Sequence, residues 1–155
     1  MDNTRTDWGF TLVEMMIVMA IVVILAALAW PSYSRQTVRV KRVEGQVALI
    51  DAMQQQERFR SQHNRYVEFS SAASEDEAQA FHWWSGHAPA NSAYELDAHA
   101  CADASLAECV EIRARPGTAK VDARFRDPDC GVLTLDSLGR QGAEPAAGAN
   151  VRCWP

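Results

Sequence analysis

Glu14 is the residue of this sequence whose type and position most clearly call for chemistry, because it is a carboxylate inside an apolar segment. Sixteen uncharged residues, from Met15 to Trp30, follow it directly. On insertion scales an acidic side chain within such a segment costs about 2.5 to 3.5 kcal/mol. An acid retained at that cost is expected to have a partner of opposite charge, so Glu14 is a candidate for an ion pair in an apolar environment.

The segment that must position Glu14 has the length of a membrane span. Residues 10–30 contain one charge, Glu14 itself, and as a helix they would extend about 31 Å at 1.5 Å per residue. That length matches the hydrocarbon core of a bilayer, so the sequence predicts a transmembrane helix over 10–30. A cleaved secretory signal is the alternative, since 26–29 offers an Ala-x-Ala site. The polar start, in which Asp2 and Asp7 outweigh Arg5, disfavours it.

The residues around Glu14 carry a family resemblance. Gly9-Phe10-Thr11-Leu12-Val13-Glu14 before an apolar run resembles the prepilin motif of type IV pilins and type II secretion pseudopilins. The resemblance implies that residues 1–9 are a leader and that a prepilin peptidase cleaves between Gly9 and Phe10. The same enzyme would N-methylate Phe10. Glu14 then becomes the fifth residue of the mature chain, and Pro31 matches the helix-kinking proline of the family.

The resemblance also gives Glu14 a partner. After cleavage the ammonium group of Phe10 on one subunit could pair with Glu14 of its neighbour, and such a buried pair would favour specificity of register more than stability. One feature departs from the family, because the leader lacks net positive charge while Arg35 and Arg42 lie beyond the apolar segment. The positive-inside rule alone would therefore reverse the orientation, and we follow the motif.

Residues 31–62 are expected to continue the helix beyond the membrane. Val40, Val43, Val47 and Ile50 recur at spacings of three and four, which makes an apolar stripe. Four further residues widen it toward Phe59: Ala48, Leu49, Ala52 and Met53. We expect this stripe to pack on the chain's own sheet, while the opposite face meets neighbouring helices in a filament. Gly45 is expected to lower the local stability of the helix and to have no further role.

Residues 63–92 read as a connector between the helix and a sheet. The acidic run Glu75-Asp76-Glu77 indicates a solvated face or the first turn of a helix. Trp83 and Trp84 indicate either a lid over the sheet, which we favour, or an exposed contact patch. We expect the connector histidines, His82 and His87, at the surface, and no metal site.

Residues 93–155 show the period-two alternation of half-buried strands. Strands are predicted over 94–98, 110–115, 121–126 and 132–135, joined by short turns. An antiparallel sheet with one polar face would result. The predicted fold class is therefore α+β, a long N-terminal helix packed on a four-stranded antiparallel sheet, which is also the type IV pilin fold that the resemblance implies.

All four cysteines lie in the last third of the chain. Behind a membrane-crossing segment, and without zinc-ligand spacing, they indicate two disulfides formed in an oxidising compartment. Four cysteines allow three connectivities. We favour Cys101–Cys109 with Cys130–Cys153, because each pair closes a local loop between predicted strands.

The C-terminal residues extend the resemblance. The run 129–139, followed by Cys153-Trp154, is similar to the end of type IVa pilins, particularly PilE-like minor pilins, a group that includes ComP-like DNA-uptake receptors. This implies that Cys130 and Cys153 bound the D-region. It implies as partners other pilin subunits, the prepilin peptidase and the inner-membrane assembly machinery. The protein would be a single-pass inner-membrane protein with a periplasmic C-terminal domain, and later part of an extracellular pilus.

The sequence offers no catalytic constellation, so we expect neither an enzyme nor a cofactor. The main interpretation is a minor pilin for pilus assembly, adhesion and twitching motility; a type II secretion pseudopilin is one alternative.

The other alternative is a ComP-like DNA receptor. Its contacts would be a basic stripe on the outer face of the sheet: Arg113, Arg115, Lys120, Arg124 and Arg126. Cross-strand pairing with Glu111 and Asp122 would instead neutralise the stripe. From His63 onward 8 basic and 14 acidic residues give a net charge of −6, which disfavours DNA binding.

Overall fold

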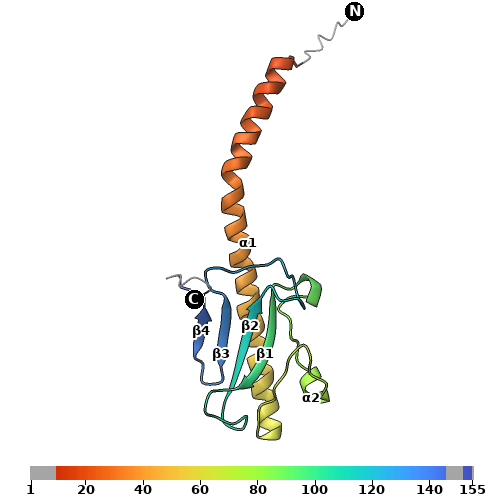
Figure 1. Ribbon diagram of the computed structural model, residues 1–155, viewed down its shortest axis with the longest axis vertical. Helices are drawn as coiled ribbons and strands as arrows, with labels where there is room; N and C mark the ends of the chain where they lie inside the picture. The colour runs from red at the N-terminus through yellow and green to blue at the C-terminus, as the bar shows by residue number, and fades with distance from the viewer. Residues whose placement is uncertain (1–9, 146–151, 155) are drawn as a thin grey trace, which may run out of the picture. The chain divides into compact units, whose positions relative to one another are not determined.

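The protein is described here by a computed structural model that covers residues 10–145 and 152–154 (Figure 1). The chain divides into two compact units, Met1–Thr37 and Val38–Pro155. One helix runs through both, and the second unit adds two short helical turns and four strands. In chain order the elements are α1 (Leu12–His63), α2 (Asp76–Gln79), a 3-10 turn (Pro89–Asn91), β1 (Tyr94–Ala100), β2 (Val110–Pro116), β3 (Val132–Asp136) and β4 (Gln141–Glu144).

The first unit is the apolar start of α1. Thr11 precedes the helix, and its Oγ1 accepts a hydrogen bond of 3.2 Å from the backbone N–H of Glu14. The pattern Thr-x-x-Glu is typical of a helix N-terminus, because it satisfies an amide that has no intrahelical partner. An 18-residue window of α1 has a mean hydropathy of 2.8 and no buried residue. By length and composition α1 can therefore cross a membrane.

The second unit is built on an antiparallel sheet with the order β1-β2-β3-β4. Its inner face is formed by paired apolar residues: Leu96 and Ala98 of β1, Ile112 and Ala114 of β2, and Leu133 and Leu135 of β3. These side chains form one cluster with Leu49 and Ala52 of α1. The predicted α+β class, with a long helix and a four-stranded antiparallel sheet, is confirmed.

The strand predicted over 121–126 is wrong. Residues 117–131, which we call the β2–β3 connection, contain no strand; Figure 1 shows them running between the ends of β2 and β3. The backbone turns locally here, since the amide of Phe125 donates to the carbonyl of Asp122 over 3.0 Å. The Asp122 carboxylate also accepts from the amide of Arg124 over 3.0 Å. Such side-chain bonds to nearby backbone compete with a sheet ladder.

The fourth strand is β4, which the sequence pattern did not predict. Its residues, Gln-Gly-Ala-Glu, have low strand propensity. A tight turn positions it, because Gly139 adopts φ +78°, a conformation that glycine reaches without strain. Trp154 then holds the strand from the C-terminal side, as its indole Nε1 donates to the carbonyl of Gly142 over 2.8 Å.

The helix face that packs on the sheet is only in part the predicted one. The stripe of Val40, Val43, Val47 and Ile50 is 42% to 57% exposed. The buried face instead carries Arg42, Gly45, Gln46, Leu49, Ala52 and Gln56. Its polar members are satisfied by distant residues; the Gln46 amide, for example, donates to the carbonyl of Cys153 over 2.6 Å. The predicted packing is therefore confirmed for Leu49 and Ala52 and wrong for the valines, because tertiary hydrogen bonds select a more polar face.

Gly45 has a packing role that the sequence did not predict. A Cβ atom at this position would lie 2.8 Å from Cδ2 of the Tyr94 ring, closer than side chains normally approach. Gly45 is buried, and Tyr94 is fully buried at the start of β1. The glycine thus allows α1 to pass close to the aromatic ring of β1.

The connector runs beside the free edge of β1. Isolated bridges join Phe69 to Ala98 and Trp84 to Glu95. Trp83 packs against the core cluster, as expected for a lid, and the carbonyl of Trp83 accepts from the amide of Leu96 over 2.7 Å. The acidic run lies at the first turn of α2.

Candidate functional site

The N-terminal candidates lie at the start of α1. Gly9, the predicted cleavage position, lies outside the described residues. Phe10 precedes the helix with an exposed side chain, and Glu14 is the third helical residue, also exposed. Pro31 lies within α1. Cleavage, methylation and the roles of Glu14 and Pro31 stay predictions.

The second unit contains a buried ion pair between Arg42 and Asp127, which the sequence did not predict. Arg42 of α1 donates from Nε to Oδ2 of Asp127, and from Nη2 to Oδ1, each over 2.7 Å. The Tyr94 hydroxyl donates to Asp127 Oδ2 over 2.6 Å, and the amide of Cys130 donates to Oδ1 over 3.2 Å. Asp127 therefore joins α1, β1 and the β2–β3 connection at one carboxylate.

The surroundings shift the ionisation of this network. Burial alone would raise the pKa of Asp127, but the hydrogen bonds from Arg42, Tyr94 and Cys130 outweigh burial and leave that pKa below its usual value. The pKa of Tyr94 is raised, first by burial and then by its hydrogen bond to the Asp127 carboxylate. The hydrogen bond to Asp127 raises the pKa of Arg42, so the pair is charged and the phenol neutral near pH 7.

The predicted basic stripe does not form on the sheet. Arg113 and Arg115 lie on β2 and point away from the core. Arg113 pairs with Glu111 over 2.7 Å, and Arg115 pairs with Asp97. These two cations are thus neutralised by acids of the sheet, one of which, Glu111, was the partner weighed from the sequence.

The other three predicted cations lie on the β2–β3 connection. The Arg126 guanidinium donates to backbone carbonyls of the same segment, including that of Ala123 over 2.7 Å. Lys120 and Arg124 are exposed, and among the described residues no carboxylate lies within ion-pair distance of either side chain. The nearby acids Asp127 and Asp129 are instead engaged by Arg42. The connection thus offers two cations to an external anion.

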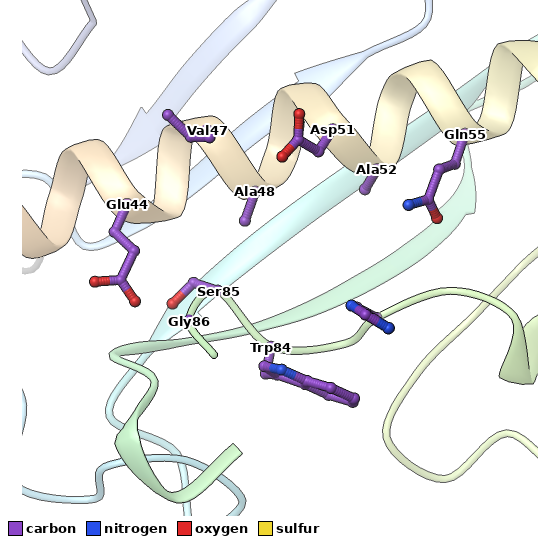
Figure 2. A pocket seen from close by; sticks show the side chains of 10 residues that line it. Glu44, Val47, Ala48, Asp51, Ala52, Gln55, Trp84, Ser85 and Gly86 are labelled. Carbon is purple, nitrogen blue, oxygen red and sulfur yellow. The ribbon is translucent and has the colours of Figure 1, made fainter. Parts of the chain in front are cut away.

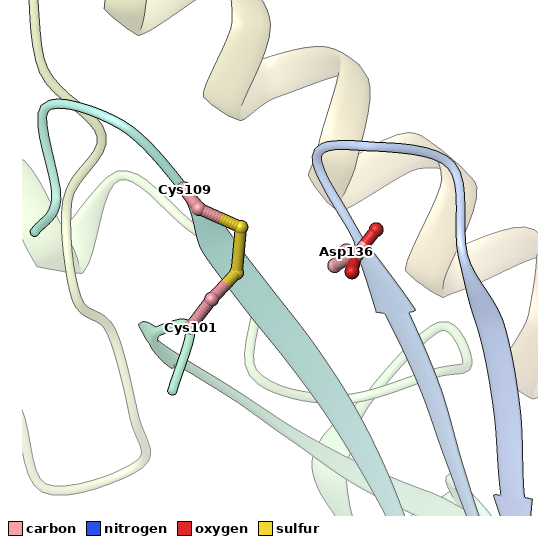
Figure 3. A group of neighbouring side chains, drawn as sticks. All are labelled: Cys101, Cys109 and Asp136. Atoms are coloured by element: carbon pink, nitrogen blue, oxygen red, sulfur yellow. A yellow bond between two sulfur atoms is a disulfide. The ribbon is translucent and has the colours of Figure 1, made fainter. Parts of the chain in front are cut away.

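Two disulfides hold the ends of the sheet, with the pairing that the cysteine spacing favoured. Cys101–Cys109 closes the β1–β2 hairpin, and Cys130–Cys153 ties the C-terminal residues to the end of the β2–β3 connection. Figure 3 shows the first of them facing Asp136 at the end of β3. Disulfide sulfurs are not thiolate ligands, and Asp136 already binds Arg140 over 2.5 Å. This cluster is therefore a structural element.

Comparison with known proteins places these features in a family. A family model described as "Type IV minor pilin ComP, DNA uptake sequence receptor" matches residues 31–134. A second model, the prokaryotic N-terminal methylation motif, matches residues 9–30. The two together span α1, β1, β2, the β2–β3 connection and the start of β3.

Individual relatives match more narrowly. The "Type IV major pilin protein PilA" of Myxococcus xanthus is 41% identical over 63 residues, which are 41% of this chain and 29% of the relative. The chain thus matches less than a third of the length of that curated relative. A type IV pilin structure from Shewanella oneidensis shares 24% identity at a TM-score of 0.45, over 76% of this chain and 98% of that one. The ComP model matches more than half of the residues of this chain. The chain therefore belongs to the ComP family of type IV minor pilins.

Proposed function

We propose that this minor pilin is the DNA-binding subunit of its pilus and recognises a DNA uptake sequence. The observation that carries the proposal is the match of the ComP receptor model to residues 31–134, which includes the β2–β3 connection and its two available cations. The match favours the DNA-receptor alternative over the main interpretation from the sequence, a minor pilin for pilus assembly, adhesion and twitching motility. Pilins are structural proteins, so the function is one of binding and assembly.

The net charge from His63 onward is −6, but on the β2–β3 connection the local charges allow contacts with DNA phosphates. Two of the three acids on the β2–β3 connection, Asp127 and Asp129, are paired with Arg42, and the third, Asp122, accepts from a backbone amide. Lys120 and Arg124 therefore face solvent without an acidic partner among the described residues. With few phosphate contacts, the affinity should fall only shallowly with salt compared with that of a strongly basic protein.

Assembly is the second part of the proposal. The prepilin peptidase cleaves between Gly9 and Phe10, and α1 holds the chain in the inner membrane with the second unit in the periplasm. The subunit then enters the pilus, where Glu14 pairs with the methylated ammonium group of Phe10 on a neighbouring subunit. The methylation motif and the apolar, exposed first half of α1 support this sequence of events.

Fluorescence anisotropy with a labelled DNA duplex tests the phosphate contacts. The full chain in detergent micelles is titrated at several salt concentrations, with Lys120→Gln and Arg124→Gln compared to the parent. Each substitution should weaken binding to all duplexes and reduce the slope of log K against log salt by about 1. Arg58→Gln, which removes an exposed arginine of α1 outside the connection, is the matched control. Unchanged slopes in both variants would remove the connection from the DNA interface.

A further inference from the structure

A pocket lies between α1 and the connector, on the side of the second unit where the valine stripe is exposed. Its volume is about 310 Å³, and its walls come from α1 on one side and residues 82–86 on the other (Figure 2). Ligand pockets begin at about this size, so a single side chain is a fitting occupant.

The charge of the lining selects a cation. Glu44 and Asp51 are the charged residues of the lining, which contains neither lysine nor arginine. Figure 2 shows Glu44 pointing from α1 toward Ser85 and Gly86. The carboxylate lies so close to Gly86 that a Cβ atom added to this glycine would be 2.6 Å from Oε1 of Glu44. Oε2 of Glu44 accepts from Lys41 over 2.9 Å. Asp51 has no ion-pair partner among the described residues, so the pocket keeps an uncompensated negative charge.

The rest of the lining suits the stem of a long basic side chain. His82 and Trp84 stack with ring centroids 4.6 Å apart and an interplanar angle of 14°. Aromatic walls attract ammonium and guanidinium groups. Val47 and Ala48 of α1 supply apolar surface opposite them, against which the methylene groups of lysine or arginine can lie.

The pocket continues into the exposed apolar stripe. At 100° per residue, Glu44 and Asp51 fall on α1 directly beside Val40 and Val47, so an apolar face borders the carboxylates. A partner that presents a basic residue next to apolar ones would cover both. DNA does not meet this description, since its phosphates would be repelled by the two carboxylates.

We propose that this pocket binds the lysine or arginine side chain of an adjacent pilin subunit in the filament. The chain belongs to a family of filament subunits, and its exposed valine stripe extends the same surface. The basic side chain enters between α1 and the connector, pairs with Asp51 and Glu44, and brings apolar residues of the partner onto Val40 and Val47. This contact is separate from the DNA interface on the β2–β3 connection and does not depend on it.

The test uses the full chain in detergent micelles, with N-acetyl-arginine amide and N-acetyl-lysine amide as probes. NMR follows the indole N–H signal of Trp84, assigned by comparison with Trp84→Phe. The cationic probes should shift this signal, and Glu44→Gln combined with Asp51→Asn should weaken their binding about tenfold. The control Glu75→Gln with Asp76→Asn removes the same charge outside the pocket and should leave binding unchanged. Equal shifts with uncharged N-acetyl-methionine amide, or no shift with any probe, would overturn the proposal.

A second measurement addresses the filament itself. Carbodiimide treatment of purified pili joins carboxylates to lysine amines in direct contact, and mass spectrometry locates the bond. A link from Asp51 or Glu44 to a lysine of another pilin, absent in the double variant, supports the contact. If both carboxylates react freely with a soluble amine in assembled pili, the pocket is open and the proposal is wrong. DNA binding by the same preparations is measured in parallel, so the two proposals fail independently.

Discussion

Arg42 and Asp127 are 85 residues apart in sequence, yet they form two hydrogen bonds of 2.7 Å inside the second unit. One residue comes from α1 and the other from the β2–β3 connection. The connection that carries Lys120 and Arg124 is therefore fixed to α1. The proposed DNA contacts and the stability of the fold are therefore linked through this pair.

Removing one partner of the pair should be strongly destabilising. Arg42→Gln leaves the buried Asp127 carboxylate without its cation, and breaking such a pair costs about 3 to 5 kcal/mol. Urea unfolding of the full chain in detergent, followed by tryptophan fluorescence, measures the loss. Lys41→Gln, which removes the neighbouring and more exposed pair with Glu44, should cost less than about 1 kcal/mol. Equal losses in the two variants would contradict the role given to Arg42.

Acid should remove the contribution of Asp127. Its folded pKa lies below the usual value of about 4, so the stabilisation is complete above that value and is lost as the pH falls through the folded pKa. The free energy of unfolding is measured against pH for the parent and for Asp127→Asn. The difference between the two should shrink below about pH 4. A difference that stays constant down to pH 2 would show that ionisation of Asp127 does not stabilise the fold.

Tyr94 should make the stability of the fold depend on pH at the alkaline end. Its pKa is raised, so its contribution is complete below the ordinary tyrosine pKa of about 10 and is lost only as the pH rises through the folded value. Spectrophotometric titration at 295 nm should therefore find that Tyr94 resists ionisation well above pH 10 in the folded chain, and more strongly than Tyr66, whose pKa burial also raises. In Tyr94→Phe the most resistant tyrosine should be missing, while Tyr66 keeps its raised pKa. Ordinary titration of every tyrosine would contradict the hydrogen bond to Asp127.

Gly45→Ala should destabilise the protein although alanine is the better helix former. The new methyl group would meet the Tyr94 ring at 2.8 Å, and the hydrogen bond to Asp127 restrains that ring. Overpacking costs about 1 to 3 kcal/mol, more than the gain of up to about 1 kcal/mol in helix propensity. Gln54→Ala, an exposed substitution on the same helix, should be nearly neutral. Increased stability of Gly45→Ala in urea would contradict the close packing.

Glu14→Ala separates processing from assembly. The substitution leaves Gly9 and Phe10 in place, so cleavage and methylation should be unchanged, whereas the proposed pair with a neighbouring ammonium group is lost. Mass spectrometry should find methylated Phe10 at the start of the mature variant in membranes and much less of the variant in sheared pili. Glu14→Asp, which keeps the charge on a shorter stem, should be incorporated better than Glu14→Ala. Normal incorporation of the alanine variant would remove the register argument.

Most of the fold could be predicted because its signals are local. The apolar run and the polar helical pattern together give α1, and alternation gives β1, β2 and β3. Residues 121–126 alternate as well as any strand, yet Asp127 must reach Arg42, and the chain turns there instead of pairing. Alternation identifies a segment that is buried on one side, and only the partner strand decides whether it joins a sheet.

The polar part of the buried α1 face and the site beneath it could not be predicted for a related reason. Hydrophobicity points to the stripe of Val40, Val43 and Val47, while the sheet contacts a face with Arg42 and Gln46. These polar side chains are buried because Asp127 and the carbonyl of Cys153 satisfy them. Partners so far away in sequence leave no local pattern. The basic residues predicted for one sheet face do not lie on one face, because that prediction placed 121–126 in the sheet. Their DNA contacts stay a prediction.

If this minor pilin recognises a specific DNA sequence, as we propose, it will select fragments that contain that sequence from genomic DNA. Sheared DNA from the organism that encodes the protein is passed over the immobilised full chain, and the retained fragments are sequenced against the input. We expect strong enrichment of one short recurring sequence, and weaker retention by Lys120→Gln and Arg124→Gln. Retained fragments with the same sequence composition as the input, in parent and variants alike, would contradict it.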